Sequence, residues 1–232
     1  MCSEPKVNRW LVGGELCSDR DFATHSALGI DDTGRIVAEG IVEALRDASL
    51  TEAFLARNRL LELLRHDHLG LVEVGDGDLI YRVCLTPSDP TVREVSRTRP
   101  MSEDLVQGVA VSVLRALVAL HGAGMIHDNI GVGTVHVGME GSQARAVLVR
   151  PAPLDSNGDA AGDLAALGWV LVRLLHERPN AGWRQSGGVK QLVVRLLDPS
   201  MPTSARSALN ALEYRRPTQK RGLRSLLGGL VG

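Results

Sequence analysis

The fold is decided by residues 120–134, which read LHGAGMIHDNIGVGT. The segment before them, from Ser102 to about His121, carries apolar residues at the spacing of one helix face. Two acidic residues, Glu103 and Asp104, follow Ser102, as is typical of the first turn of a helix. We therefore predict a long helix that leads into the polar run 127–129.

The chain after this stretch is predicted to be mostly helical. Residues 163–177 are almost wholly apolar, so we predict a buried helix there. Residues 151–162 are rich in Pro, Gly, Ser, Asn and Asp, which is typical of a loop. The other predicted elements are short strands at Val135–Val137 and Ala146–Val149 and helices at 188–198 and 203–214.

The chain before residue 86 is predicted to be rich in strands, with one helix. Ser49 and Glu52 have the spacing of a capping box, so a helix is predicted from there to the residues before His66. Residues 86–90 contain two prolines and are predicted to form a linker. The predicted strands lie at 10–12, 23–30, 35–45, 69–74 and 79–85, the last two as a hairpin around Gly75–Asp78.

The composition argues against several classes of protein. The net charge of −1 and the 3% of aromatic residues disfavour a nucleic-acid-binding surface. Cys2, Cys17 and Cys84 lack metal spacing, and we expect free thiols in a reducing compartment. His66 and His68 have no third ligand nearby, so no metal is expected. No apolar run reaches the roughly 20 residues of a membrane span, and no signal peptide is evident, so we expect a cytoplasmic domain, free or attached to a membrane complex.

Four segments resemble, in order and spacing, the bacterial Ser/Thr protein kinases of the Hanks type. Residues 120–127 resemble the family's LHxxGIVH run, and residues 163–171 its DxxxLGxxL helix. Residues 54–68 resemble FLRE…LxHPN, and residues 34–38 the turn and strand that end in VAxK. The resemblance implies a two-lobed α+β fold with an N-terminal extension at 1–8, a β-rich N-lobe with one helix at 9–86, a helical C-lobe at 87–214 and a basic tail at 215–232.

The resemblance places other residue types where a kinase has its catalytic groups. The VAxK lysine falls on Gly40, and the helix glutamate that would pair with it falls on Arg57. The catalytic base falls on Asn129, or on Asp128 if a one-residue gap is allowed. An amide cannot accept the substrate proton as a carboxylate does. No lysine occurs anywhere between residues 7 and 189.

The metal-binding positions of the family are also changed. They fall on Thr134 and Arg150, and a guanidinium group has no lone pair with which to bind magnesium. The resemblance further implies a shortened activation segment, because only residues 151–162 separate Arg150 from Asp163 and the APE motif is missing. Met201 stands where the arginine partner of that motif would lie.

Four residues keep the types of the family and are expected to act as structural anchors. Ala38 is expected in the N-lobe core, and Leu61 is expected to pack inward from the N-lobe helix. His127 and Asp163 are expected to fix the loop at 127–134 against the central helix. Asp163 has a second interpretation as an exposed N-cap of its own helix.

We therefore expect a catalytically inactive kinase-like domain, a pseudokinase, that acts as a binding scaffold or allosteric regulator in bacterial signalling. We expect a protein partner, no cofactor, and weak or absent binding of ATP and magnesium. One alternative is an unorthodox ATP-dependent phosphotransferase in the same cleft, with Asp128 beside Glu39 or Glu43; another is an unrelated α+β domain. The basic tail contains Thr218 and Ser225 as potential phosphorylation sites and is expected to be solvated.

Overall fold

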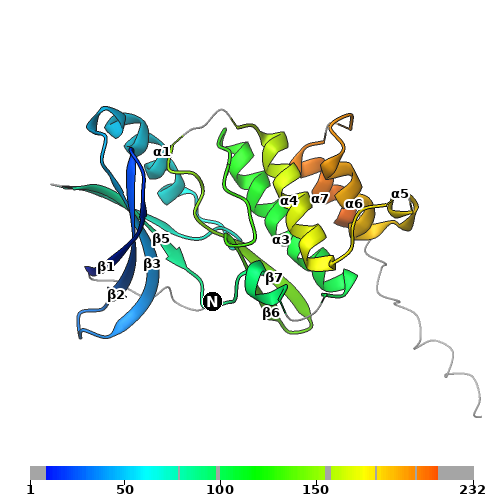
Figure 1. Ribbon diagram of the computed structural model, residues 1–232, viewed down its shortest axis with the longest axis horizontal. Coiled ribbons are helices and arrows are strands. Elements are labelled where there is room, and N and C mark those ends of the chain that lie inside the picture. The colour runs from blue at the N-terminus through cyan, green and yellow to red at the C-terminus, as the bar shows by residue number, and fades with distance from the viewer. Residues whose placement is uncertain are drawn as a thin grey trace, which may run out of the picture.

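The computed structural model describes residues 9–77, 79–97, 100–154, 158–180, 182–201 and 203–213. It confirms the predicted two-lobed α+β architecture, with a strand-rich lobe beside a helical lobe (Figure 1). The basic tail with Thr218 and Ser225, the residues before Arg9, and Cys2 lie outside the described residues.

The N-terminal lobe is built on one antiparallel sheet with the strand order β1-β2-β3-β5-β4. Its strands pair as neighbours along the chain except where α1 and β4 intervene between β3 and β5. The strands are β1 (Arg9–Ser18), β2 (Phe22–Ile30), β3 (Ile36–Leu45), β4 (Val72–Asp76) and β5 (Ile80–Thr86). β1 is an edge strand, and register shifts interrupt its pairing with β2 after Val12.

The register between β3 and β5 decides which side chains face the other lobe. Glu43 lies opposite Arg82, and Ile41 lies opposite Cys84, on the face that packs towards α1 (Thr51–Leu63). Because side chains alternate along a strand, Gly40 and Val42 lie on the other face. That second face has its own small core of Ala27, Val42 and Val83 under Trp10 and Tyr81.

The start of α1 differs from the predicted capping box. A short 3-10 turn, η1 (Ala48–Leu50), precedes the helix, and Asp47 rather than Ser49 supplies the cap by accepting a hydrogen bond from Ser49 N at 2.9 Å. Asp47 supplies the cap because its carboxylate accepts hydrogen bonds from both the amide and the hydroxyl group of Ser49. The Ser49 hydroxyl is thus used before the helix begins.

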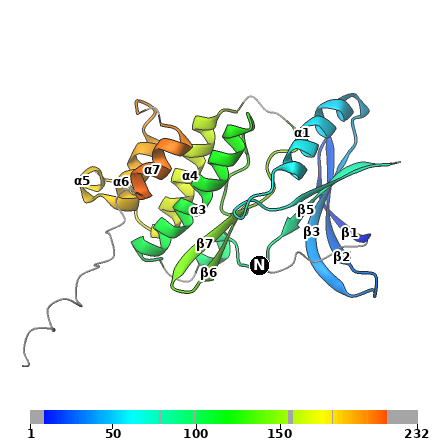
Figure 2. The same ribbon diagram turned by 180° about the vertical axis from the view of Figure 1, so that it is seen from behind.

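The C-terminal lobe is organised around α3 (Glu103–Gly122), whose apolar side chains lie in the main core. The hairpin of β6 (Val135–Glu140) and β7 (Gln143–Leu148) packs on α3 and lies between the sheet and the helices (Figure 2). The other helices are α2 (Val92–Val95), α4 (Ala160–Leu175), α5 (Trp183–Ser186), α6 (Gly188–Leu197) and α7 (Ala205–Glu213).

Three features of this lobe differ from the prediction. The short helices α2 and α5 have four residues each, which is too few for a periodic pattern to be visible. The hairpin strands are longer than predicted and leave a turn of only residues 141–142. The apolar helix α4 is not wholly buried, because Trp169 is 62% exposed.

One helix among the described residues, α3, is long and apolar enough to cross a membrane. More than half of that segment is buried inside the protein. Its apolar side chains Val109, Val113, Leu117 and Leu120 are fully buried against other elements of the lobe. A core helix of a folded domain accounts for this composition.

Candidate functional site

The loop at 127–134 is fixed to α4 through one buried carboxylate. Asp163 is 3% exposed and accepts hydrogen bonds from the backbone amides of His127 and Asp128, each at 2.8 Å. His121 Nε2 lies 2.9 Å from the same carboxylate. The N-cap of α4 is Asp159, which accepts from Gly162 N at 2.7 Å. Asp163 is therefore a buried acceptor, and the alternative interpretation as an exposed N-cap is wrong.

The protonation of this anchor follows from the same contacts. Burial by itself raises the pKa of Asp163, but the hydrogen bonds from His121 and from the amides of residues 127 and 128 outweigh it, so the pKa is lowered. Burial lowers the pKa of His127. The geometry agrees, because His127 Nδ1 accepts from Asn129 N at 3.3 Å and so carries no proton. The anchor is an ionised carboxylate beside a neutral imidazole.

Thr134 and Asn129 tie the loop together and connect it to the next segment. Thr134 Oγ1 donates to the carbonyl oxygen of Asn129 at 2.6 Å and accepts from Gly131 N at 2.9 Å. The Asn129 side-chain amide donates to the carbonyl oxygen of Arg150 at 2.8 Å. Asp128 and Arg150 have φ values of 53° and 55°, a left-handed conformation that non-glycine residues rarely adopt. These bonds hold the strained backbone in place.

A buried ionic cluster then joins the segment after Arg150 to the sheet. Glu43 on β3 accepts from Arg82 Nε at 2.6 Å and from an Arg150 terminal nitrogen at 3.1 Å. Arg82 is fully buried, and its two terminal nitrogens donate to the carbonyl oxygen of Pro151 at 2.5 Å and to Asn58 Oδ1 at 2.8 Å. We call Glu43, Asn58, Arg82 and Arg150 the cleft cluster.

Helix α1 contributes a second arginine from its inner face. Arg57 donates through Nε to the carbonyl oxygen of Ala152 at 2.9 Å and through a terminal nitrogen to that of Ile126 at 2.6 Å. Its neighbour Asn58 donates to the carbonyl oxygen of Pro153 at 2.9 Å. Main-chain oxygens of the C-terminal lobe are thus satisfied by α1, where a helix glutamate could only accept.

Gly40 does not belong to this arrangement. A Cβ atom at Gly40 would lie 2.9 Å from Val83 Cγ1 and 3.1 Å from a ring carbon of Trp10, on the face of the sheet away from α1. The ungapped placement of the family lysine on Gly40 is therefore out of phase with the strand. A one-residue shift moves a side chain to the other face of a sheet, and the charged residue of β3 that faces α1 is Glu43.

The remaining expected anchors lie in different surroundings. Leu61 is buried in the main core together with Val72 and Cys84. Ala38 is not in a core; it is half-buried and lines an open groove between β3, the segment 85–91 and His136. Ala38 lies near the start of β3, where the sheet meets the linker, so no helix covers it.

This groove encloses about 1140 Å³ and is bordered by acidic groups. Glu39, Asp89 and Glu94 line it, and His136 Nδ1 lies 2.6 Å from the carbonyl oxygen of Asp89. This volume is slightly above the roughly 300–1,000 Å³ of typical small-molecule sites, because the groove is open to solvent. These carboxylates would repel the triphosphate of a nucleotide.

The charges of the cleft also oppose a divalent cation. The carboxylate of Glu43 is bonded to the guanidinium groups of Arg82 and Arg150, and a third guanidinium group, that of Arg57, donates to the carbonyl oxygen of Ala152. Magnesium needs oxygen ligands in octahedral geometry, normally with one or two carboxylates. No group of three or more His, Cys, Asp or Glu side chains that could hold a metal occurs among the described residues. His66 and His68 have no third partner there.

The sequence prediction recognised part of this site. Residues 129, 134 and 150 are brought together by the structure, and Arg57 joins them through Ala152. The sequence prediction missed Asn58 and Arg82, and it considered Glu43 only as a candidate base. A usable signal was present, since Arg82 interrupts the apolar run of a buried central strand and a charge there requires a partner.

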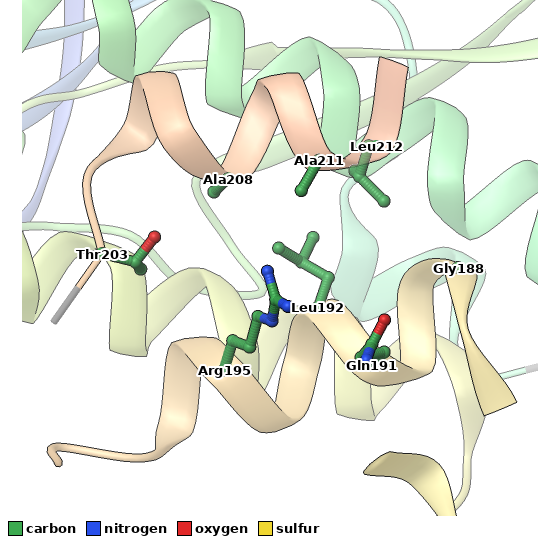
Figure 3. Close-up of a pocket in the computed structure, with 8 residues that line it drawn as sticks. All are labelled: Gly188, Gln191, Leu192, Arg195, Thr203, Ala208, Ala211 and Leu212. Carbon is green, nitrogen blue, oxygen red and sulfur yellow. The ribbon is translucent and has the colours of Figure 1, made fainter. Parts of the chain in front are cut away.

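A separate cavity lies between α6 and α7. Figure 3 shows that it is bounded by Leu192 and Arg195 of α6 and by Ala208 and Ala211 of α7. It holds about 20 Å³, which is room for about one water molecule. It is a packing defect between helices and is too small for a ligand.

Comparison with known proteins supports the fold. No family model matches the chain. No curated protein matches its sequence. Among solved structures, the chain is similar to a mutant of the Mycobacterium tuberculosis PknI kinase domain, with 15% identity, a TM-score of 0.61, and coverage of 92% of this chain and 98% of that one.

It is also similar to Rad53 in complex with AMP-PNP, with 14% identity, a TM-score of 0.64, and coverage of 87% of this chain and 64% of that one. At these identities the likeness concerns the fold. The strand-rich lobe, the helical lobe and both similarities agree with the resemblance seen in the sequence. The chain has the two-lobed protein-kinase fold.

Proposed function

We propose that this chain is a pseudokinase: a protein-kinase-like domain that does not transfer phosphate and acts as a binding scaffold or allosteric regulator in a phosphorylation pathway. One observation carries the proposal. Glu43 is the charged residue of β3 that faces α1, as the lysine of a kinase would, and it is bonded to Arg82 and to Arg150, on which the family resemblance places a metal-binding aspartate. Relative to a kinase site, a carboxylate thus replaces the cation and a cation replaces the carboxylate.

The inversion has a chemical consequence. Phosphoryl transfer depends on metal ions that bridge the phosphates and on a carboxylate that accepts the proton of the acceptor hydroxyl. In this cleft the carboxylate of Glu43 is bonded to two guanidinium groups. The side chain of Asn129 donates to the carbonyl oxygen of Arg150 and offers no base. The groups present serve to join the two lobes.

The alternative, an unorthodox ATP-dependent phosphotransferase, has less support. Its candidate base, Asp128, is exposed, but Glu43 is committed to Arg82 and Arg150 and Glu39 lies in the groove beside the linker. A pair of Asp128 with either glutamate would therefore need a rearrangement of the cleft. We place the protein in the cytoplasm of a bacterium with a protein partner, in keeping with its composition.

A phosphotransfer assay tests the proposal. The full chain is incubated with labelled ATP and magnesium, manganese or no metal, together with generic acceptor proteins. We expect no label above that of the Asp128→Asn variant under any condition. Incorporation of phosphate by the wild type that Asp128→Asn abolishes would establish the phosphotransferase instead.

A further inference from the structure

The outer face of the N-terminal sheet, which is the face away from α1, is concave. Trp10 on β1 and Glu73 on β4 stand on the two opposite edges of the five-stranded sheet. The Trp10 indole nitrogen Nε1 nevertheless donates a hydrogen bond to Glu73 Oε2 at 2.8 Å. In a flat sheet, four inter-strand spacings would separate these edges by roughly 19 Å, which the two side chains are too short to span. The sheet therefore curls towards its outer face.

Aromatic rings line a pocket on this concave face, in a chain that has few of them. The chain contains three Trp, two Tyr and two Phe residues, and Trp10 and Tyr81 both line the pocket. Each ring lies over a glycine: a Cβ atom at Gly40 would be 3.1 Å from the ring of Trp10, and one at Gly75 would overlap the ring of Tyr81. Both aromatic side chains are half-buried. The sheet thus holds the two rings in place and leaves part of each accessible.

The pocket also contains a carboxylate without a cationic partner. It holds about 510 Å³, within the range of small-molecule sites, and the buried side chain of Val42 forms part of its apolar floor. Within the described part of the chain, the Glu73 carboxylate bonds to the neutral indole of Trp10 and to no cationic side chain. Arg9 also lines the pocket, but it is exposed and forms no ion pair with a described residue.

A half-buried carboxylate beside Trp and Tyr rings is suited to an alkylated ammonium ion. The face of an aromatic ring is electrostatically negative and attracts a cation, and aromatic pockets recognise quaternary ammonium groups in this way. The methyl groups of such an ion fit an apolar floor, and they need no hydrogen-bond acceptor. Glu73 supplies the opposite charge. The repulsion from Arg9 is weaker, because an exposed guanidinium group is screened by water and salt.

We propose that the pocket between Trp10, Tyr81 and Glu73 binds a quaternary ammonium group, carried by a small molecule such as choline or by a trimethylated lysine of a partner protein. The pocket and the cleft cluster lie on opposite faces of the sheet. Binding in the pocket therefore does not depend on whether the cleft transfers phosphate.

The indole N–H signal of Trp10 reports directly on the pocket in NMR spectra of the full chain. The variant Trp10→Phe identifies this signal among the three indole signals. We expect choline, at millimolar concentration and constant ionic strength, to shift the Trp10 signal saturably and to leave those of Trp169 and Trp183 unchanged. The neutral isostere 3,3-dimethylbutan-1-ol should bind at least about fivefold more weakly, because it lacks the charge.

Matched variants test the sign of the ligand's charge. Glu73→Gln keeps an oxygen acceptor for the Trp10 indole but removes the negative charge, so it should weaken choline binding by about fivefold or more. Arg9→Ala removes a like charge and should strengthen it by about twofold. The control Glu52→Gln alters an exposed glutamate on α1 and should leave the affinity unchanged. These variants retain the hydrogen bond of Trp10 and are expected to fold.

The amide of Nα-acetyl-trimethyl-lysine distinguishes the two sources of the group. Tighter binding of this amide than of choline would support a partner lysine, and the reverse order would support a small molecule. Three outcomes would overturn the proposal. The first is the absence of a saturable shift of the Trp10 signal with either ligand. The second is equal affinity for choline and its neutral isostere, which would leave only an apolar pocket. The third is tighter binding in Glu73→Gln with weaker binding in Arg9→Ala, as expected for an anion.

Discussion

Two buried polar networks hold this protein together, and each contains one carboxylate. In the helical lobe, Asp163 accepts from main-chain amides and from His121. In the cleft, Glu43 accepts from the side chains of Arg82 and Arg150. The first network fixes the path of a loop, whatever side chains that loop carries. The second neutralises charged side chains and depends on their identity.

The comparison suggests why one network resembles the kinase family and the other does not. Main-chain amides are present in every sequence, so a carboxylate that accepts from them stays useful when the loop side chains change. A side-chain charge is useful only while its partner remains, and an unpartnered buried charge is costly. Glu43 and Arg82 therefore have to be present together. The fold can keep its anchor while the chemistry of its cleft is replaced.

The largest effect is expected in the cleft cluster. Arg82→Met should lower the free energy of unfolding by about 3–5 kcal/mol, because it leaves buried oxygen atoms of Glu43 and Pro151 without their donor. Urea denaturation measures the loss. The double variant Glu43→Leu with Arg82→Met should lose much less, because the carboxylate that has lost its buried donor is gone. Equal losses in both variants would contradict the ionic account of the cluster.

A smaller but more localised effect is expected at the anchor. Asp163→Ala should cost about 1–3 kcal/mol, because the amides of residues 127 and 128 lose their acceptor. Hydrogen exchange should become faster throughout residues 127–134. The matched control, Asp159→Ala, removes the N-cap and should cost about 1 kcal/mol. Faster exchange confined to the first turn of α4 in both variants would contradict the anchor.

These two networks also show how far the sequence could be interpreted. The order of the elements, the long helix before residue 120 and the closeness of residues 129, 134 and 150 were predictable, because periodicity and motif spacing are local properties. The partners of Arg82 were not, since Glu43 and Asn58 meet it through the register of β3 and the packing of α1. For the same reason, the sequence alone did not show which residues of β3 face α1. The family lysine was therefore misplaced on Gly40.

Substitution at Gly40 tests the conclusion that this residue faces away from α1 and does not hold the position of the family lysine. Gly40→Lys should lower stability by about 1–3 kcal/mol, because its Cβ would press against Val83 and Trp10. It should not produce nucleotide binding, because the side chain lies on the face away from α1. Gly40→Ala is the graded control and should destabilise less. A stable Gly40→Lys variant that binds ATP would restore the original placement of the lysine.

The smallest effect is expected from pH. His127 is buried and neutral with a lowered pKa, so below pH 6.5 the unfolded chain binds a proton that the folded protein does not. The contribution of neutral His127 to the free energy of unfolding is therefore fully present above pH 6.5 and is lost as the pH falls. The free energy of unfolding should decrease by about 1 kcal/mol between pH 6.5 and 5.5. Urea midpoints across this range measure it, and His127→Gln should flatten the slope. The pKa values of His66 and His68 are also lowered by burial, so part of the slope should remain.

The central claim is that the cleft cluster has replaced the nucleotide and metal site. It is tested most directly by thermal unfolding of the full chain with and without 1 mM ATP and magnesium. A site with a dissociation constant of about 10 μM would add about 2.7 kcal/mol and raise the midpoint by roughly 5–10 °C. We predict no rise in the midpoint. A rise of that size, abolished by EDTA, would contradict the account.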